Sequence, residues 1–557
     1  MAGTARCTPA GDIATATADR GVSSFVPSVW GDFFLKYTPS ISERSKEWMT
    51  HRADLLKEEV RQMFETSKAI GTAETLTLVD TLERLGIDNH FENEINTALN
   101  CIHSEELEFE TSSDLHTVAL RFRLLRQHGF WVSADIFNKF RDDTGCFGET
   151  VRSDPRSMLS LYNAAHLAAP GEEILDEAIS LSRRQPKSMK CYIRSPLADQ
   201  VSRALDIPQP RVPKRMETMH YIVEYEKEEL HNDTVLELAR LEFNLVRSLH
   251  LKELKALSLW WRDLYGAVKL SYARDRLVEN YFWTCCVFEE EEYSRARIML
   301  AKIFGLCSLM DDTYDVYATL EECQKLNEAI QRWDESAVSI LPDYLRMFYI
   351  KLLRNFDELE DSLEAHEKYR MFYAKKAYKL LSKYYLDEAE WSNENHEPNF
   401  KEHVEVSVMS SGYPTLAVMV LVGMGDMVTK ETFEWAIGVP DMVSASGEVA
   451  RFLNDIASYK GWKNQNDVAS SVECYVEDHG TTGEEAVAAI TTMVEHAWRR
   501  MNQSCMEMDH ALLPAAQLVV KLTRVLEIIY LRGRDAYTSG GDLKDLVTSL
   551  FLKPVPI

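Results

Sequence analysis

The chain has 557 residues, of which 45% are hydrophobic, and its formal net charge is −26 at pH 7. This length exceeds that of one ordinary hydrophobic core, so we expect two or three large domains. The acidic balance argues against nucleic acid and anionic membrane surfaces as main partners, and an anionic substrate would need local cations or bound metal.

Composition and periodicity predict the fold class. Gly (23) and Pro (17) are few for this length. Strict alternation of polar and apolar residues is rare and long helical periods dominate, so the chain is predicted to be all-α. The ten cysteines are scattered without CxxC or zinc spacing. That pattern favours free thiols in a reducing compartment over disulfides.

No apolar run reaches the length of a membrane span, and Leu416–Met424 is predicted to be a core helix that follows a break. Residues 1–19 lack the apolar core of a secretory signal. They contain Ala, Thr and one Arg, as organelle transit peptides do, but Asp12, Asp19 and the short length argue against one. A cytoplasmic location is therefore expected.

The first part of the chain is predicted to be an irregular arm followed by helices. Residues 1–30 form the arm, and the helical period begins near residue 40. One helix, from Thr72, should end at Gly86, which is a good C-terminal cap. Further helices continue to about Leu205. Asp142-Asp143-Thr144 begins like an acidic metal motif, but Cys146 replaces the third acid, so we interpret it as a structural loop.

A proline-rich segment predicts the domain boundary. Three prolines fall within six residues between Pro208 and Pro213 and cannot continue a helix. We therefore predict one helical domain at residues 1–212 and a second at 213–557. The first domain lacks a DxDD pattern and shows no chemistry of its own, and no short repeat suggests a solenoid.

The second domain opens with an arginine pair and an aromatic cluster. Arg274 and Arg276 are separated by one residue, and two guanidinium groups so placed suit a phosphate, although most such pairs are surface residues. Trp283 closes a Tyr-Phe-Trp run. Such clusters are usually core, but ring faces could also stabilise a carbocation.

Three carboxylates follow the apolar stretch 298–310. Asp311 and Asp315 are four residues apart and would share a helix face, and Asp312 lies about 100° round from Asp311. Desolvating these carboxylates unpaired is costly, and oxygen ligands without His or thiolate favour a hard cation such as Mg²⁺. A solvated helix end is the alternative for an isolated DDxxD motif.

Two later segments carry polar residues at helical spacing. Asn454, Ser458 and Trp462 are spaced by four and would share one face, and Arg451 and Lys460 could meet anionic oxygens. An ordinary helix with a polar face is the alternative. The segment from Tyr530 to Asp542 leads from an apolar helix into a Gly pair, which suits either a mobile lid or a surface turn.

Taken together, these motifs resemble a plant terpene synthase of the ionisation-initiated class, and most of all a monocot sesquiterpene synthase. The resemblance covers nearly the whole chain. The ordered set that carries it is Arg20-Gly21 with Trp30, Arg274/Arg276, Tyr-Phe-Trp283, Asp311-Asp312-Thr-Tyr-Asp315, Asn454-Asp-Ile-Ala-Ser458, and Tyr530 with Asp535-Ala-Tyr537-Thr538.

The resemblance implies a helical barrel that binds a prenyl diphosphate with three Mg²⁺ ions (Mn²⁺ is possible). It implies that residues 1–212 are non-catalytic, with an arm that helps to cover the site. The implied metal ligands are Asp311, Asp315, Asn454 and Ser458, with Asp312 in support. Implied diphosphate neighbours are Arg274, Arg276, Arg451 and Lys460. Implied aromatic wall residues are Trp283, Tyr530 and Tyr537, with Asp535 linked to them, and Ser410-Ser411-Gly412 matches a break in a cavity-lining helix.

The sequence departs from the family pattern at two positions. Gly21 replaces the second arginine of a tandem pair, which favours farnesyl over geranyl diphosphate. Trp462 stands where the family usually has a metal-binding Glu, and an indole offers only an N–H donor.

We expect a monomeric sesquiterpene synthase that uses farnesyl diphosphate. The alternatives are a plastidial monoterpene synthase that uses geranyl diphosphate, a catalytically impaired helical binding protein, and a chain-elongating prenyltransferase. The last would carry a second DDxxD where this chain has Asn454 and Ser458.

Overall fold

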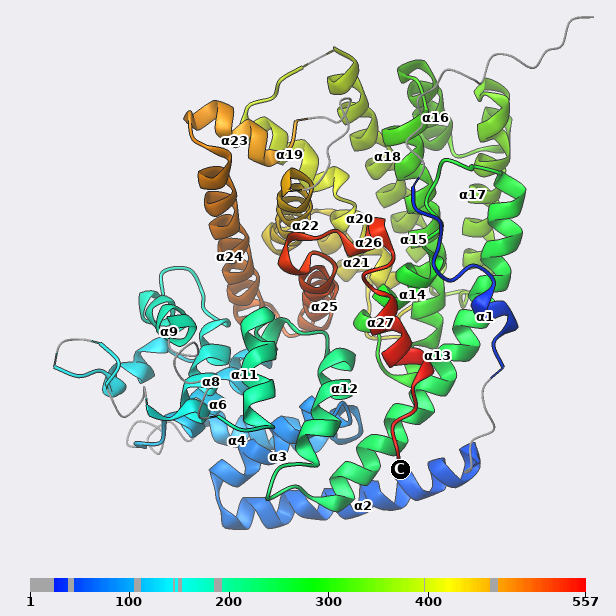
Figure 1. The fold of residues 1–557 in the computed structure, drawn as a ribbon. Helices are drawn as coiled ribbons and strands as arrows, with labels where there is room; N and C mark the ends of the chain where they lie inside the picture. Colours follow the sequence, from blue (N-terminus) through cyan, green and yellow to red (C-terminus); the bar gives the residue numbers. More distant parts are fainter. Residues whose placement is uncertain are drawn as a thin grey trace, which may run out of the picture.

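A computed structural model describes residues 25–38, 45–104, 112–143, 146–148, 153–184, 193–394, 396–460 and 469–557. Within these ranges the chain is helical, and the extended pairing is limited to an isolated bridge between Arg141 and Phe147. The all-α prediction is confirmed (Figure 1). Arg20, Gly21 and Trp462 lie outside the described residues, as does the side chain of Lys460.

The N-terminal half begins with the long helix α2 along the lower edge of the molecule in Figure 1, where it packs against α13. Ser45 caps α2 by accepting a hydrogen bond from Trp48 N. The helix predicted to end at Gly86 is α3, and Gly86 has a φ of +69°, as predicted for a glycine cap. The helices of this half are α1 (Phe33–Lys36), α2 (Lys46–Ile70), α3 (Thr72–Arg84), α4 (Glu92–Ser104), α6 (Leu115–Gln127), α8 (Pro155–Ala165), α9 (Glu173–Arg184), α11 (Leu197–Asp206) and α12 (Lys214–Tyr225).

Buried apolar side chains form two clusters. The smaller one lies among α6, α8 and α9 and includes Phe122, Leu161 and Leu175. The larger one extends from α2 and α3 into the helices of the second half, so the two halves share one continuous hydrophobic core. The predicted boundary at residue 212 remains a prediction.

The proline-rich segment is buried rather than exposed. Gln209–Arg211 form one 3₁₀ turn between α11 and α12. Arg211 is 4% exposed and donates to both carboxylate oxygens of Glu495 at 2.8 and 2.6 Å. The segment therefore joins the halves through a fixed ion pair with α24.

The second half forms a closed ring of helices. Each successive pair in the order α14, α15, α18, α19, α22, α25 and back to α14 is in contact, and α20 packs against α15, α18, α19, α22 and α25 (Figure 1). The helices are α13 (Asp233–Val268), α14 (Leu277–Val287), α15 (Ser294–Asp312), α16 (Leu320–Arg332), α17 (Asp343–Asp361), α18 (Arg370–Glu394), α19 (Phe400–Ser410), α20 (Tyr413–Val422), α21 (Lys430–Ile437), α22 (Asp441–Lys460), α23 (Ser471–His479), α24 (Gly483–Glu507), α25 (Leu513–Ile529), α26 (Ala536–Ser539) and α27 (Lys544–Val547).

Helix α20 is a buried, apolar element of this ring. All ten of its residues are buried, which its apolar sequence requires. By length and composition, the stretch Phe400–Val422 is the one candidate membrane span among the described helices, but 72% of its most apolar window is buried inside the protein. This burial matches the core helix predicted from Leu416–Met424.

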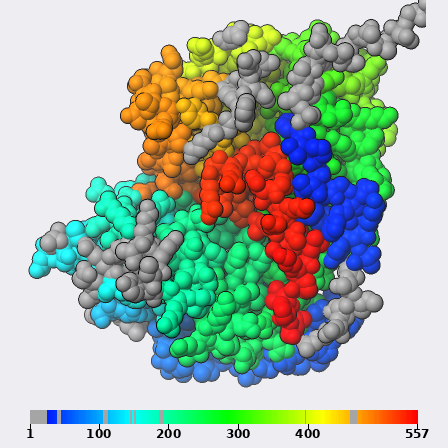
Figure 2. All heavy atoms as spheres, viewed as in Figure 1, coloured from blue at the N-terminus to red at the C-terminus, as the bar shows by residue number. Residues whose placement is uncertain are grey.

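The two ends of the described chain meet on one face. In the space-filling view the blue N-terminal segment lies beside the red C-terminal segment (Figure 2). Helix α1 packs against α13, and Trp30 is 7% exposed. Residues 25–32 are irregular, as predicted for the arm.

Candidate active site

The aspartate-rich motif lies at the end of α15, but its last turn is not α-helical. Residues Thr313–Tyr317 form a π turn, in which Ala318 N donates to Thr313 O at 2.9 Å. Asp311 therefore lies in the last turn of α15 and Asp315 lies in the π turn, so the helix face predicted for both spans the junction of the two turns and stays a prediction. Single π turns occur frequently at functional sites because they re-aim the side chains that follow.

Asp312 differs from its two acidic neighbours because it is fully buried. Its carboxylate accepts from Arg274 N at 2.6 Å and lies 2.8 Å from Arg274 Nη2. Asp311 also lies 2.6 Å from Arg274 Nη2. Asp312 therefore holds Arg274 in place, and Asp311 and Asp315 are left as the more accessible carboxylates.

A further carboxylate faces this motif from α18. Solvent reaches Asp315, but protein atoms crowd its carboxyl group. This partial desolvation, together with the charges of Asp311 and Glu388, raises its pKa well above the ordinary value. Tyr385 lies one turn before Glu388, and burial together with the nearby charge of Asp311 raises the pKa of its hydroxyl well above the ordinary value. Glu388 and Tyr385 were not predicted from the sequence. Both lie on α18, and their three-residue spacing was a weak signal within an acidic helix.

Helix α22 brings the polar residue Arg451 close to Glu388, and so close to the aspartate-rich motif. Arg451 donates to Ser410 Oγ at 2.9 Å and lies 3.6 Å from Glu388. Burial lowers the pKa of Arg451, but the charges of Glu388, Asp455, Asp315 and Asp311 raise it above the ordinary value. The two polar segments, which lie far apart in the sequence, therefore converge through Glu388.

The other predicted ligands on α22 differ in exposure. Asn454 is half-buried and donates from Nδ2 to the Tyr530 hydroxyl at 3.1 Å. Ser458 is exposed one turn further along the helix. The side chains of Lys460 and Trp462 cannot be placed here, because they lie outside the described residues.

An aromatic wall lines the site, consisting of Trp283, Phe304, Tyr413, Tyr530 and Tyr537. The Trp283 ring centroid lies 5.2 Å from that of Phe304, 6.4 Å from that of Tyr413 and 5.9 Å from that of Tyr537. The Tyr537 hydroxyl lies 2.9 Å from Asn280 Oδ1. Phe304 and Tyr413 were not predicted, although Tyr413 directly follows the predicted helix break.

The predicted break itself is present between α19 and α20. Helix α19 ends at Ser410, and Gly412 has a φ of +78°, a conformation that favours glycine. Ser411 Oγ donates to Val408 O at 2.6 Å and so uses one of the carbonyls left free at the helix end.

Asp535 and Arg276 hold backbone rather than facing the carboxylates. Asp535 accepts from Tyr537 N and Thr538 N, both at 2.9 Å, and caps α26. Arg276 is 1% exposed, and its nitrogens donate to backbone carbonyls, including Tyr537 O at 2.9 Å. Both backbone contacts of Asp535 use Oδ1, whereas Arg276 has all three guanidinium nitrogens engaged. The catalytic role predicted for Asp535 and the phosphate-binding role predicted for Arg276 stay predictions.

The oxygen donors fit Mg²⁺. Among the described residues, no three His, Cys, Asp or Glu side chains already form a metal site. Mg²⁺ ordinarily binds one or two protein carboxylates and completes its shell with water and substrate phosphate oxygens. The raised pKa of Asp315 reflects desolvation and, after it, the negative charges of Asp311 and Glu388, which a bound cation would offset.

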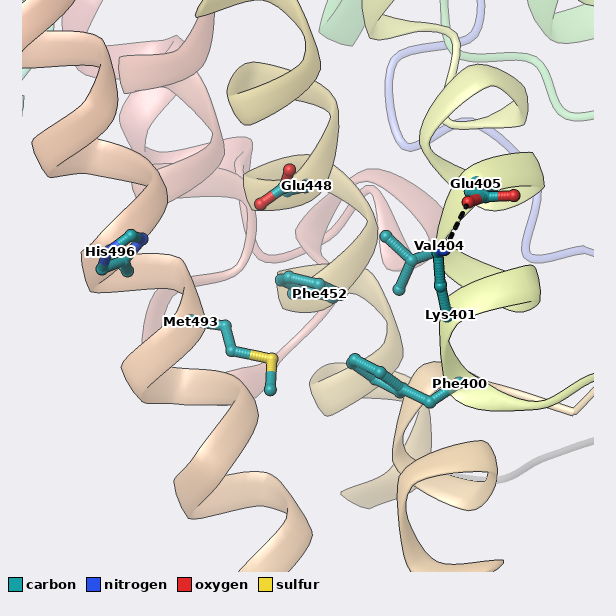
Figure 3. Close-up of a pocket in the computed structure, with 8 residues that line it drawn as sticks. All are labelled: Phe400, Lys401, Val404, Glu405, Glu448, Phe452, Met493 and His496. Carbon is teal, nitrogen blue, oxygen red and sulfur yellow. Dashed lines mark ion pairs between the residues drawn. The ribbon is translucent and has the colours of Figure 1, made fainter. Parts of the chain in front are cut away.

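A separate groove of about 310 Å³ lies on the outside of α19, α22 and α24 (Figure 3). Phe400, Val404, Phe452 and Met493 form its apolar lining, and Glu405, Glu448 and His496 flank it. None of the predicted site residues lines it, so it is distinct from the carboxylate cluster.

Comparison with known proteins places both halves in one family. Residues 29–205 match the "Terpene synthase, N-terminal domain" model, and residues 262–500 match the "Terpene synthase family, metal binding domain" model. Maize eudesmanediol synthase is 59% identical over 96% of this chain and 96% of its own, and maize tau-cadinol synthase is 47% identical over 98% and 100%. Grey poplar isoprene synthase, solved with three Mg²⁺ ions and dimethylallyl-S-thiolodiphosphate, has a TM-score of 0.85 at 33% identity and covers 91% of this chain and 97% of its own.

Proposed function

Because this chain belongs to the terpene synthase family, we propose that it is a sesquiterpene synthase that ionises farnesyl diphosphate and releases diphosphate and a sesquiterpene. The observation that carries the proposal is the convergence of Asp311 and Asp315 with Glu388 and Arg451 beside the aromatic wall. The maize relatives, matched over nearly their whole length, support a sesquiterpene product.

The diphosphate end of the substrate would lie between two groups of metal-binding residues. Asp311, Asp315 and Glu388 would hold Mg²⁺ on one side, and Asn454 and Ser458 on the other. The bound ions would neutralise the leaving diphosphate and so lower the barrier to breaking the carbon–oxygen bond.

Three groups of residues do the remaining work. Arg274 and Arg451 supply positive charge for the diphosphate oxygens, and Asp312 fixes the orientation of Arg274. The ring faces of the aromatic wall stabilise the allylic cation. The apolar helix α20 helps to exclude water from the active site, which delays capture of the cation by water.

Incubation of the purified protein with Mg²⁺ and either farnesyl or geranyl diphosphate tests this function, with volatiles identified by mass spectrometry. A C15 product from farnesyl diphosphate with equal release of diphosphate is expected, and a chelator should abolish both. Preferred turnover of geranyl diphosphate would favour the monoterpene alternative. A longer prenyl diphosphate would indicate chain elongation, and binding without diphosphate release would indicate an impaired binding protein.

An oxygenated product is the favoured refinement, because maize eudesmanediol synthase is 59% identical to this chain. In that case water captures a late cation. Incubation in H₂¹⁸O should add two mass units for each hydroxyl group in the product, and products that are all hydrocarbons would contradict the refinement.

We also propose that the protein is monomeric and cytoplasmic. Size-exclusion chromatography with light scattering and imaging of a C-terminal fluorescent fusion in plant cells test these two proposals.

A further inference from the structure

Arg276 connects three segments that are distant in sequence. Its Nη2 atom donates to Val26 O at 2.8 Å in the N-terminal arm and to Thr538 O at 2.7 Å in the C-terminal segment. Its Nε atom donates to Tyr537 O at 2.9 Å, and Nη1 donates to Asp275 O at 2.9 Å. Every guanidinium nitrogen thus has a carbonyl partner, and the side chain is 1% exposed.

The contacts of Arg276 reach the active site through the segment that it holds. The ring of Tyr537 belongs to the aromatic wall, and Thr538 Oγ1 accepts from Arg274 Nη1 at 3.0 Å. Arg274 in turn lies 2.6 Å from Asp311. A shift of the C-terminal segment would therefore move both an aromatic ring and a cationic side chain of the site.

The side chain of Arg276 is tightly packed against the C-terminal segment. Gly540 has a φ of +62°, and a Cβ at this position would lie 3.3 Å from the Arg276 guanidinium carbon and 3.5 Å from Glu279 Oε1. Glu279 is fully buried and lies beside the Trp30 indole of the arm. Burial raises the pKa of Glu279 to about 7.

We propose that Arg276 is a positioning residue that fastens the N-terminal arm and the C-terminal segment together over the active site, rather than a ligand of the diphosphate. A planar guanidinium can bridge several carbonyls at fixed angles, whereas a lysine ammonium is a point charge on a flexible stem. The two roles therefore predict different results for a substitution that keeps the charge. The product readout below rests on the proposed function, but the exchange readout does not.

The first experiment measures hydrogen exchange by mass spectrometry in substrate-free protein carrying Arg276→Lys, Arg276→Gln or Gly540→Ala. We expect exchange in residues 25–38 and 536–543 to accelerate about tenfold or more in all three variants, as the loss of charge-assisted hydrogen bonds predicts. Gly541→Ala is the matched control, because the nearest atom to a Cβ there is a carbonyl 3.9 Å away. Unchanged exchange in both segments of Arg276→Lys would overturn the proposal.

The second experiment compares kinetics and products with farnesyl diphosphate. For a fastening role, Lys and Gln at position 276 should be about equally impaired, with a larger share of acyclic alcohols formed by early water capture. For a diphosphate ligand, Lys should restore KM and product-diphosphate inhibition close to wild type while Gln does not, and that result would overturn the proposal. A wild-type protein without turnover would refute the proposed function, and the exchange experiment would still decide the role of Arg276.

Discussion

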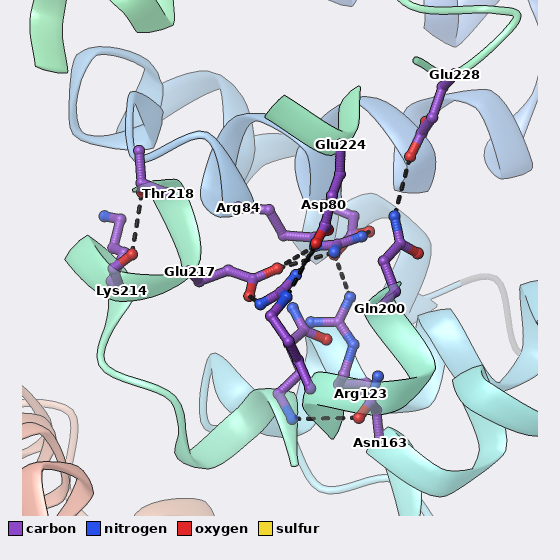
Figure 4. A network of polar contacts seen from close by, with 12 residues as sticks. Asp80, Arg84, Arg123, Asn163, Gln200, Lys214, Glu217, Thr218, Glu224 and Glu228 are labelled. Carbon is purple, nitrogen blue, oxygen red and sulfur yellow. Dashed lines mark hydrogen bonds and ion pairs between the residues drawn. The ribbon is translucent and has the colours of Figure 1, made fainter. Parts of the chain in front are cut away.

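Replacing Glu217 with Gln tests the ion network that joins α3, α11 and α12 (Figure 4). Glu217 is 5% exposed and accepts from Arg84 Nε at 2.8 Å and from Arg203 Nη1 at 2.6 Å. Burial alone would raise its pKa, but the charges of Arg84 and Arg203 lower it from 4.5 to about 2. Because one pKa unit corresponds to about 1.4 kcal/mol, the ionised carboxylate stabilises the folded state by about 3 kcal/mol at pH 7.

The direction of the pH dependence follows from the lowered pKa. The folded state binds this proton less readily than the unfolded chain, so the stabilisation is complete above pH 4.5 and is lost as the pH falls toward 2. Glu217→Gln should therefore lower the melting temperature by several degrees at pH 7. The difference in melting temperature between Glu217→Gln and the wild-type protein should become smaller as the pH falls below 4.5.

Glu224→Gln is the matched control on the same helix. Glu224 also pairs with Arg203, at 2.7 Å, but burial raises the pKa of its carboxyl group, so its ionised form adds no comparable stability. Differential scanning fluorimetry between pH 3 and 8 compares the three proteins. Equal melting temperatures for wild type and Glu217→Gln at pH 7, or a larger loss for Glu224→Gln, would refute the reasoning.

Three further substitutions, one of them with a control substitution, test the active site and the helix packing that supports it. Asp312→Asn should lower kcat and leave the Mg²⁺ dependence of the rate almost unchanged, because the Asp312 carboxylate holds Arg274. Steady-state kinetics at varied Mg²⁺ concentration test this prediction. A large rise in the Mg²⁺ concentration needed for half-maximal activity would instead identify Asp312 as a metal ligand. Gly423→Ala should lower the free energy of unfolding by about 1–3 kcal/mol, because its Cβ would lie 2.5 Å from the Cα of Ala296. Gly425→Ala, which meets nothing within 4 Å, should be neutral in the same denaturation assay. Trp462→Glu should lower the Mg²⁺ concentration needed for half-maximal activity, because it supplies a missing carboxylate, and unchanged Mg²⁺ dependence would contradict this.

Local sequence determined the parts of the protein that depend on spacing within one element. Gly86 had to end a helix because its backbone takes a conformation that other residues avoid. The apolar run after Gly412 had to be buried, because no face of α20 is polar. The acidic motif at the end of α15 could likewise be recognised, since its three carboxylates follow an apolar helix directly.

Tertiary contacts decided what each recognised residue does. Side chains of the π turn after Asp312 contact distant segments: the Tyr272 and Thr313 hydroxyls lie 3.0 Å apart, and the Tyr314 and Ser382 hydroxyls lie 2.9 Å apart. No local pattern reports such contacts, and a π turn is rare without them.

The arginine pair shows the same limit. Arg274 and Arg276 look equivalent in sequence, but the first contacts Asp311 and Asp312 and the second contacts three backbone segments. Glu388 joins the acidic cluster only because α18 packs beside α15 in the ring. Sequence spacing fixes which side chains share an element, whereas packing between elements fixes which charges meet.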